Sequence, residues 1–322
     1  MAHSATSEQL IAPSETVVTK QSLLSAYATL FKLRVSVMVL ITAATGLYLG
    51  RLRSGLSPFD LQSLYAILGI AVVTCGASAL NQALERKSDA RMHRTSSRPM
   101  VTGRISLPHG LILGFAATFA GTVFLARETN LLTGTLTLLT AVLYVAIYTP
   151  LKRITSLNTF IGAFPGALPP LIGWTAARGL IEWPAVALFA VLFVWQFPHF
   201  MAIGWMYRDD YRHGGIRLAA TQQPLTWAAR STVFQALFYA VLMIPVALWT
   251  TFLGVTGIPY AVIATILSLG YLWYTLRFAQ ILRDPAAEST RTPARNLLKA
   301  SVIYLPLLLA AMILNAHGRV WF

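Results

Sequence analysis

The chain has very little charge for its length. Only 11% of its 322 residues are Asp, Glu, Lys or Arg, whereas 56% are hydrophobic. A soluble domain carries about 25% charged residues, so this composition argues against one. It favours a protein whose apolar surface is covered by a lipid bilayer.

Cysteine is nearly absent too, and so is any targeting signal. The single Cys75 lies in an apolar stretch, which excludes an internal disulfide and a cluster of metal-binding thiolates. Residues 1–20 are polar and contain no apolar run of signal length. We expect residues 1–30 to form a disordered cytosolic tail and 31–322 to form a membrane domain, and this favours a bacterial inner membrane.

Nine stretches contain no charged residue, and each is close to the length of a membrane span. A helix rising 1.5 Å per residue needs about 20 residues to cross about 30 Å of hydrocarbon. The stretches cover residues 35–49, 64–84, 107–126, 131–151, 157–177, 183–206, 231–253, 258–276 and 300–316. We therefore predict an all-α, polytopic membrane protein with nine transmembrane helices.

The connections between these stretches alternate in basic charge. Of the 25 Lys and Arg residues, 20 fall on the side that holds the N-terminus. The positive-inside rule then predicts a cytosolic N-terminus and a periplasmic C-terminus. Topology and attraction to anionic membrane lipid account for the net charge of +14, so nucleic-acid binding is not expected.

Three oxygen-bearing side chains follow one another at four-residue steps as the second stretch ends. Asn81, Glu85 and Asp89 would line one face of a helix. Carboxylates suit Mg²⁺, which also takes water and phosphate oxygens. Guanidinium groups that can grip a phosphate bidentately come next in the chain: Arg94, Arg98 and Arg104.

The alternative is a solvated helix end whose charges pair among themselves. Asn81 and Glu85 lie at the edge of a charge-free stretch, where a polar side chain is costly unless it faces a cavity or a partner. Pairing with Arg86 or Lys87 would satisfy them as well. Periodicity alone does not decide between the two.

A second polar segment follows the sixth stretch. His199 and Asp210 are eleven residues apart, so they share a face if the helix is continuous past Pro198. Gln196 lies one turn before His199. We expect Gln196, His199 and the pair Asp209–Asp210 to face one vestibule, with a hydrogen-bonded core histidine as the alternative.

Glycine and proline are concentrated in residues 162–173 of the fifth stretch. Proline removes helical donors, so we expect this span to be broken and kinked. The alternative is a tight helix crossing through its glycine-spaced face.

Taken together, these segments resemble the intramembrane prenyltransferases, and most closely their protoheme farnesyltransferase (heme O synthase) branch. The 81–89 motif is typical of prenyltransferases in general, whereas Trp-Gln-x-Pro-His-Phe at 195–200 and Tyr-Thr-Pro-x-Lys-Arg at 148–153 are typical of the heme branch. The resemblance runs over nearly the whole chain from Lys32. It also rests on Met92, Arg94-Thr95, Arg98-Pro99, Gly166-Ala-Leu-Pro169-Pro170 and Asp210-Tyr211.

The resemblance implies a ring of nine helices around a central cavity, with both acidic motifs over its cytosolic mouth. It implies transfer of a farnesyl group from farnesyl diphosphate to a vinyl group of heme B, with water addition, giving heme O for terminal oxidase assembly. The implied cofactor is Mg²⁺. Candidate partners are heme A synthase and terminal-oxidase assembly factors.

The resemblance also assigns roles to individual residues. Catalysis would involve Asn81, Glu85, Asp89, Asp210 and His199. Mg²⁺ would be held by Glu85, Asp89, Asp209 and Asp210. Substrate would contact Arg94, Arg98, Lys152, Arg153, Gln196, Tyr148, Arg208 and Tyr211. His199 would serve the heme side as ligand, orienter or base. An aromatic cavity would be lined by Trp174, Trp195, Phe197, Phe200 and Trp205.

The sequence departs from the family pattern in three places. Leu33 replaces a Pro between Lys and Arg, Lys87 replaces a third carboxylate found in some members, and Arg217-Leu218 replaces a Pro-Met pair. Lys87 leaves the number of metal ions open, and Arg217 is a further candidate for the diphosphate.

Two rival functions remain at this point. The first is a prenyltransferase that acts on another aromatic or chlorin acceptor. The second is a membrane transporter or an oxidase-assembly scaffold, since broken helices and intramembrane polar residues also mark transport paths. A transporter predicts charge at mid-bilayer, whereas the acids here lie at one edge of the spans.

Overall fold

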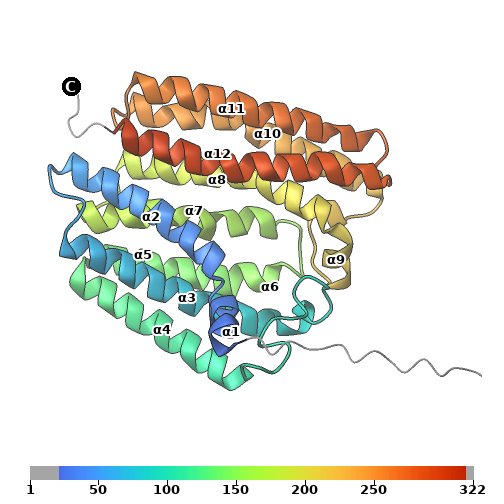
Figure 1. Cartoon of the computed structure of the whole chain (residues 1–322), viewed down its shortest axis with the longest axis horizontal. Helices are drawn as coiled ribbons and strands as arrows, with labels where there is room; N and C mark the ends of the chain where they lie inside the picture. The colour runs from blue at the N-terminus through green and yellow to red at the C-terminus, as the bar shows by residue number, and fades with distance from the viewer. Residues whose placement is uncertain (1–21, 317–322) are drawn as a thin grey trace, which may run out of the picture.

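The computed structural model describes residues 22–316, and these residues are helical apart from connecting turns and one isolated antiparallel bridge between Thr256 and Ala316 (Figure 1). The long helices are α2 (Leu33–Arg53), α3 (Leu61–Asp89), α4 (Leu107–Glu128), α5 (Leu131–Val142), α7 (Asn158–Arg178), α8 (Trp183–Met206), α10 (Leu225–Phe252), α11 (Ile258–Phe278) and α12 (Arg291–Leu314). The short segments are α1 (Leu23–Leu30), the π-helical η1 (Leu143–Tyr148), α6 (Thr149–Leu151), α9 (Arg208–His213), and the 3₁₀ segments η2 (Ala219–Thr221), η3 (Ala279–Leu282) and η4 (Glu288–Thr290).

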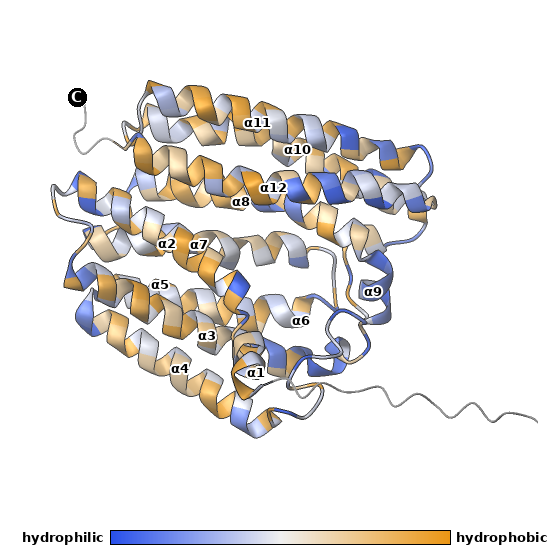
Figure 2. Ribbon diagram, in the orientation of Figure 1, coloured by the Kyte–Doolittle hydropathy of each residue, from blue (hydrophilic) through white to orange (hydrophobic). Residues whose placement is uncertain are grey.

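Within the described residues, nine helical segments are long and apolar enough to cross a membrane. They coincide with the nine charge-free stretches, so the predicted number and order of spans are confirmed. In the fourth span α5, η1 and α6 follow one another directly. Hydrophobic residues dominate the middle of the bundle and hydrophilic ones gather near its ends (Figure 2).

The boundary predicted for the N-terminal tail is wrong. Residues 23–30 of the expected tail form helix α1, in which Ala26 and Leu30 are buried against α3. An apolar face on this helix supplies the burial that a disordered segment would lack. Residues 1–21 lie outside the described residues, so the rest of that prediction stays untested.

Local sequence accounts for where several helices begin and end. Asp60 caps α3 by accepting a hydrogen bond from the Ser63 amide at 2.8 Å, and Asn130 caps α5 in the same way. These side chains satisfy amides that have no partner within the helix. Helix α7 ends at Arg178 and is followed by Gly179, whose φ of +73° is the left-handed conformation that glycine adopts without strain.

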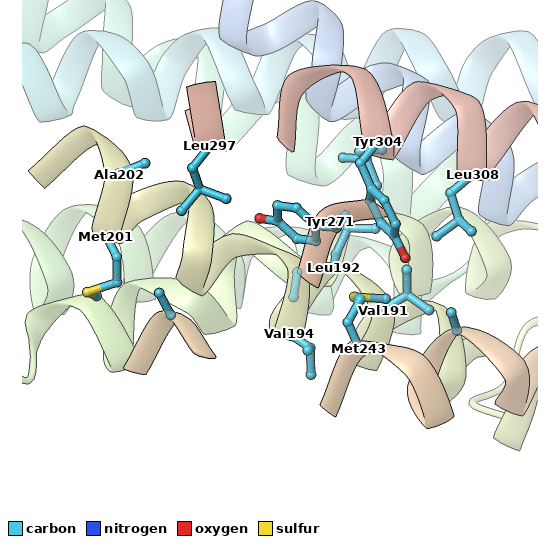
Figure 3. Close-up of a cluster of buried hydrophobic side chains, with 14 of the residues drawn as sticks. Val191, Leu192, Val194, Met201, Ala202, Met243, Tyr271, Leu297, Tyr304 and Leu308 are labelled. Carbon is cyan, nitrogen blue, oxygen red and sulfur yellow. The ribbon is translucent and has the colours of Figure 1, made fainter. Parts of the chain in front are cut away.

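The helices form two groups that lie side by side (Figure 1). One contains α2, α3, α4, α5 and α7, and the other contains α8, α10, α11 and α12; α7 also packs on α8 and joins them. The largest buried cluster lies mainly in the second group, where Tyr271 and Tyr304 stand beside Val191 and Met243 (Figure 3). We call the end of the bundle at which α3 finishes, α9 lies and α12 begins the acidic end.

The expected break in the fifth span is wrong, because α7 is uninterrupted. It contains three prolines: Pro165, Pro169 and Pro170. The alternative, a tight crossing, is what the structure has: a methyl group on Gly173 would overlap the Ala43 carbonyl of α2. Close packing of α7 on α2 offsets the hydrogen bonds that the prolines remove.

Candidate active site

The side chains of the first acidic motif share one face of α3, as predicted. Asn81, Glu85 and Asp89 are 0%, 8% and 1% exposed, and the helix runs without interruption to Asp89. Arg86 and Lys87 are exposed and form no ion pair with them. The alternative of a solvated, locally paired helix end is therefore wrong.

Two cations from outside α3 hold the two carboxylates. The Lys152 ammonium lies 2.5 Å from Glu85 Oε1, and the Arg98 guanidinium lies 2.5 Å from Asp89 Oδ2 and 3.6 Å from Glu85 Oε2. The second Asp89 oxygen, Oδ1, is buried and has no hydrogen-bond partner among the described residues. A buried oxygen without a partner is costly, so this atom is suited to meet a ligand.

Lys152 keeps its positive charge although its side chain is largely buried. Burial alone would lower the pKa of the ammonium, but the Glu85 carboxylate outweighs this and raises the pKa above its usual value of 10.5. The ammonium also lies 4.4 Å from the centre of the Tyr148 ring, which favours a cation. Lys152 is therefore a fixed positive charge at neutral pH.

An unusual helical turn brings Tyr148 to this place. Residues 143–148 are wound as a π-helix just before Pro150, which has no N–H to give to the preceding turn. The Thr149 hydroxyl donates to the Tyr144 carbonyl at 2.8 Å instead. Single π-turns within α-helices are frequent at functional sites, and here one places Tyr148 in the wall of a pocket.

Lys32 is a site residue that sequence reasoning missed. Its ammonium lies 2.5 Å from Asn81 Oδ1 and 3.1 Å from the Tyr144 hydroxyl, while Asn81 Nδ2 donates to Thr149 Oγ1 at 2.8 Å. Asn81 therefore positions a cation and a helical turn and does not itself line the pocket. A lysine just before the first span is the one signal for this role in the sequence.

These groups surround a pocket of about 180 Å³ at the acidic end. Its charged lining consists of four cations and two carboxylates: Lys32, Arg94, Arg98, Lys152, Glu85 and Asp89. Tyr148, Tyr211, Phe200, Met201 and Ile203 contribute uncharged surface. An excess of cations suits a polyanion such as a diphosphate, and two adjacent carboxylates suit a divalent cation.

The second acidic motif contacts the segment that follows the first motif, and it does so through backbone amides of that segment. Asp210 accepts hydrogen bonds from the His93 amide at 2.6 Å and the Arg94 amide at 3.3 Å. Arg91 in turn donates to the Gly214 carbonyl at 3.0 Å. Asp210 therefore fixes the turn after α3 and does not line the pocket.

The four carboxylates expected to hold Mg²⁺ do not lie together: Glu85 and Asp89 line the pocket, whereas Asp209 and Asp210 do not. Asp209 is 54% exposed and faces Arg208 at 3.8 Å and Arg212 at 3.6 Å. No group of three or more His, Cys, Asp or Glu residues in the described part of the chain is placed to hold a metal. The backbone bonds made by Asp210 and the local arginines around Asp209 account for the difference.

Of two arginines expected to contact substrate, Arg94 lines the pocket and Arg208 does not. Arg94 lines the pocket and stacks over Tyr207 and Tyr211 at 5.5 and 5.7 Å. Arg208 lies over the Trp205 ring at 4.7 Å, away from the pocket lining. Burial lowers the pKa of Arg208, its neighbour Arg212 adds to this, and Asp209 acts in the opposite direction.

Three other basic residues do not line the pocket. Arg153 is exposed and donates a hydrogen bond to the hydroxyl of the buried Ser88 at 3.1 Å. Arg104 is exposed. Arg217 donates to the Ile154 carbonyl at 2.9 Å, so its side chain is used to hold a loop. None of these positions could be decided by spacing in the sequence.

The predicted vestibule for Gln196 and His199 is wrong. Helix α8 runs through Pro198 but ends at Met206, so the face that these residues share does not continue to Asp210. Gln196 donates to the Ala163 and Leu192 carbonyls. His199 lies 2.7 Å from the Ser301 hydroxyl and stacks on Trp195, so it bridges α8 to α12.

Only one of the aromatic residues expected around a cavity lines the pocket, Phe200. The others pack elsewhere. Trp174 donates to Glu182 at the opposite end, Phe197 stacks on Tyr239 at 3.6 Å, Trp195 donates to the Ser301 carbonyl and Trp205 lies beneath Arg208.

The residues that are present fit a divalent cation beside a diphosphate. Asp89 Oδ1 is buried and unpartnered, and Glu85 faces the same pocket. Mg²⁺ needs few protein carboxylates, because water and phosphate oxygens complete its octahedron. Two carboxylates surrounded by fixed cations are therefore enough to bind one divalent cation together with a diphosphate.

Relatives of known name match the chain along most of its length. A protoheme IX farnesyltransferase from Koribacter versatilis is 45% identical over 294 residues, which cover 91% of this chain and 94% of the relative. One from Solibacter usitatus is 38% identical and covers 91% of this chain and 99% of the relative. A mitochondrial one from Arabidopsis thaliana is 34% identical over 90% of this chain and 64% of its own length.

Solved structures share the fold at lower identity. A structure described as a digeranylgeranylglyceryl phosphate synthase superposes with a TM-score of 0.72 at 18% identity, covering 91% of this chain and 98% of the other. A UbiA homologue from Archaeoglobus fulgidus bound to GPP and Mg²⁺ superposes with a TM-score of 0.55 at 15% identity, covering 89% and 99%.

The family profile described as "UbiA prenyltransferase family" matches residues 39–298. This match spans eight of the nine membrane helices completely or in large part and includes both acidic motifs. The chain belongs to the UbiA prenyltransferase family.

Proposed function

We propose that this protein transfers a farnesyl group from farnesyl diphosphate to a vinyl group of heme B, with water addition, to give heme O. Relatives named protoheme IX farnesyltransferase, up to 45% identical, support the acceptor. One structural observation carries the chemistry: a buried carboxylate pair, with one oxygen free, among four cations in one pocket.

The reaction asks the pocket to stabilise a leaving diphosphate. The allylic C–O bond breaks, its electron pair leaves with the diphosphate, and a vinyl carbon of heme B attacks the farnesyl cation. Water then adds to the resulting carbocation and releases a proton. Cations that are already fixed around the diphosphate stabilise this transition state, because negative charge grows there as the bond breaks.

Each residue of the pocket has a proposed part. Lys32, Arg98 and Lys152 face the diphosphate, and Arg94 covers it while held by Tyr211. Glu85 and Asp89 would hold Mg²⁺, which would neutralise part of the diphosphate charge when bound. Asn81 positions Lys32, and Asp210 positions the turn that carries Arg94.

Residues outside the pocket keep proposed supporting roles. Gln196 fixes the packing of α8 on α7, and His199 serves the heme side through its bridge to α12. Arg153 and Arg208 are proposed to attract anionic substrate to the acidic end, and Asp209 is proposed to hold Arg208 and Arg212 in place. We infer that His199→Ala raises KM for heme B and leaves KM for farnesyl diphosphate nearly unchanged.

We further propose that the protein lies in a bacterial inner membrane, with its N-terminus and the acidic end in the cytosol and its C-terminus in the periplasm. The excess of Lys and Arg on that side supports this orientation. A reporter that is active only in the cytosol should report activity when fused before residue 22 and none when fused after residue 316.

The direct test uses the purified protein in detergent with heme B, farnesyl diphosphate and Mg²⁺. We expect a heme product whose mass increases by one farnesyl group plus water, and loss of that product after chelation. No such mass gain, with a gain on another aromatic or chlorin acceptor, would exclude heme. Full turnover in Mg²⁺-depleted protein would exclude the metal assignment.

A further inference from the structure

We propose that the groove between α11 and α12 binds one anionic phospholipid, with its phosphate at Arg277 and Lys299 and an acyl chain along the apolar part of the groove. The groove has a volume of about 680 Å³ and is lined only by α11, η3 and α12. It shares no lining residue with the diphosphate pocket.

The polar lining of the groove lies at its acidic end. Arg277 and Gln280 come from the end of α11 and η3, and Asn296 and Lys299 come from the first turns of α12. No Asp or Glu among the described residues lines the groove. Neither Arg277 nor Lys299 forms an ion pair with a described residue, so both charges are available to an anion.

The apolar lining lies deeper in the membrane span. Leu267 is ten residues before Arg277 on α11, which corresponds to about 15 Å along a helix. Ile266 is 64% exposed and Ile303 is 60% exposed, so both edges of the groove face the lipid. A cationic end followed by an apolar trough matches an anionic amphiphile.

The floor of the groove is rigid and leaves room for a chain. Tyr271 and Tyr304 stack with ring centroids 4.9 Å apart (Figure 3). Their hydroxyls are turned inward, to the Trp195 carbonyl at 3.1 Å and to the Ser268 hydroxyl at 2.9 Å. A methyl group added at Gly270 would meet nothing within 4 Å, so the trough there is open.

The groove is separate from the diphosphate pocket. Trp195 and His199 of α8, bonded to Ser301 of α12, lie next to the floor, while the diphosphate pocket is lined by Phe200 and Gly204 of the same helix. A molecule in the groove is therefore on another side of the bundle from the diphosphate. Basic pockets between membrane helices on the side rich in Lys and Arg commonly bind anionic headgroups.

The test is native mass spectrometry of the full-length, delipidated protein titrated with phosphatidylglycerol or phosphatidylcholine. We expect one phosphatidylglycerol to be retained preferentially. Arg277→Gln with Lys299→Gln should weaken this by about 25-fold, since each basic side chain near a membrane surface contributes about fivefold in affinity. Arg295→Gln, an exposed arginine of α12 outside the groove lining, is the matched control and should change retention less than twofold.

A second variant tests the trough separately from the charge. Gly270→Leu places a side chain in open space, so the variant should fold normally and show an unchanged thermal unfolding profile. The added side chain should occupy the trough, so retention of both lipids should be lost. Equal retention by the double variant and the Arg295→Gln control would overturn the proposal. A parallel titration with heme B is the second check. If the groove variants lost retention of heme B and kept retention of phosphatidylglycerol, the proposal would also be overturned.

Discussion

The two ends of the bundle both carry ion pairs close to helix termini, but they differ in whether every carboxylate oxygen has a partner. At the end opposite the acidic end, Glu182 accepts hydrogen bonds on both oxygens from Arg178, with one more from Trp174. Asp60 is likewise fully occupied by Arg51 and by the Ser63 amide. These carboxylates serve to join helix ends.

At the acidic end, the pairs are more deeply buried and incomplete. Glu85 and Asp89 share Arg98 and Lys152, yet Asp89 Oδ1 remains without a partner. Ion pairs alone therefore do not distinguish a site from a structural contact. Asp89 differs because one of its carboxylate oxygens is buried without a partner while the residue lines a pocket rich in cations, so a bound ligand would offset the desolvation cost of that oxygen.

The largest difference between the two ends is expected for Asp89→Asn. This change removes the negative charge but keeps the shape, so turnover should fall about 100- to 1,000-fold, in line with the loss of one preorganised electrostatic group. Steady-state assays with farnesyl diphosphate and heme B measure this. Glu182→Gln at the other end is the control and should keep turnover within twofold; similar losses in both variants would contradict the distinction.

Glu85 and Lys152 allow a double-mutant cycle. Glu85→Gln alone leaves the Lys152 ammonium without its carboxylate partner, and Lys152→Met alone leaves the Glu85 carboxylate without its ammonium partner. Each single change should therefore destabilise the protein by about 3 kcal/mol. The double variant should recover part of that stability without recovering activity. Thermal unfolding and turnover are measured together. Additive losses of stability would show that the two groups do not interact.

Asp210 and Asp209 form a matched pair of neighbouring carboxylates with different surroundings. Asp210→Asn weakens two hydrogen bonds that hold the turn carrying Arg94, so KM for farnesyl diphosphate should rise about tenfold, given about 1.5–3 kcal/mol for hydrogen bonds to charged groups. Asp209→Asn, on an exposed side chain, should change KM less than twofold. The opposite order of effects would mean that Asp209 is the residue that meets the substrate.

The smallest effect is expected from the pH dependence of Glu182. Its hydrogen bond from Arg178 lowers the pKa of this carboxyl below its usual value of 4.5. The stabilisation is therefore present above about pH 4.5 and is lost as the pH falls through the lower value of the folded state. Because the pair is partly exposed, the loss should be below about 1 kcal/mol. Glu182→Gln should remove this part of the pH dependence of thermal unfolding; an unchanged profile would contradict it.

Much of the fold was open to prediction from the sequence. The nine spans followed from stretches without charge, because a bilayer excludes unpaired charge regardless of tertiary context. The shared face of Asn81, Glu85 and Asp89 followed from helical periodicity alone. Both inferences depend only on local chemistry and on the solvent.

The predictions that failed concerned segments whose course depends on distant contacts. Helix α7 continues through its prolines because α2 packs against Gly173. The face that His199 shares is lost because the chain turns at Tyr207 before Asp210. Residue spacing along the chain predicts neither the continuity of α7 nor the turn at Tyr207.

The membrane class, the number of spans and the helix face that carries the carboxylates can all be read from the amino-acid sequence, because they depend on residue type and helical repeat. The cations that meet those carboxylates depend instead on how the helices pack. Lys32 and Lys152 reach Asn81 and Glu85 from positions 49 and 67 residues away. Such pairs form because burial of a charge in the bundle is costly without a partner, and only the packed helices decide which partner lies within reach.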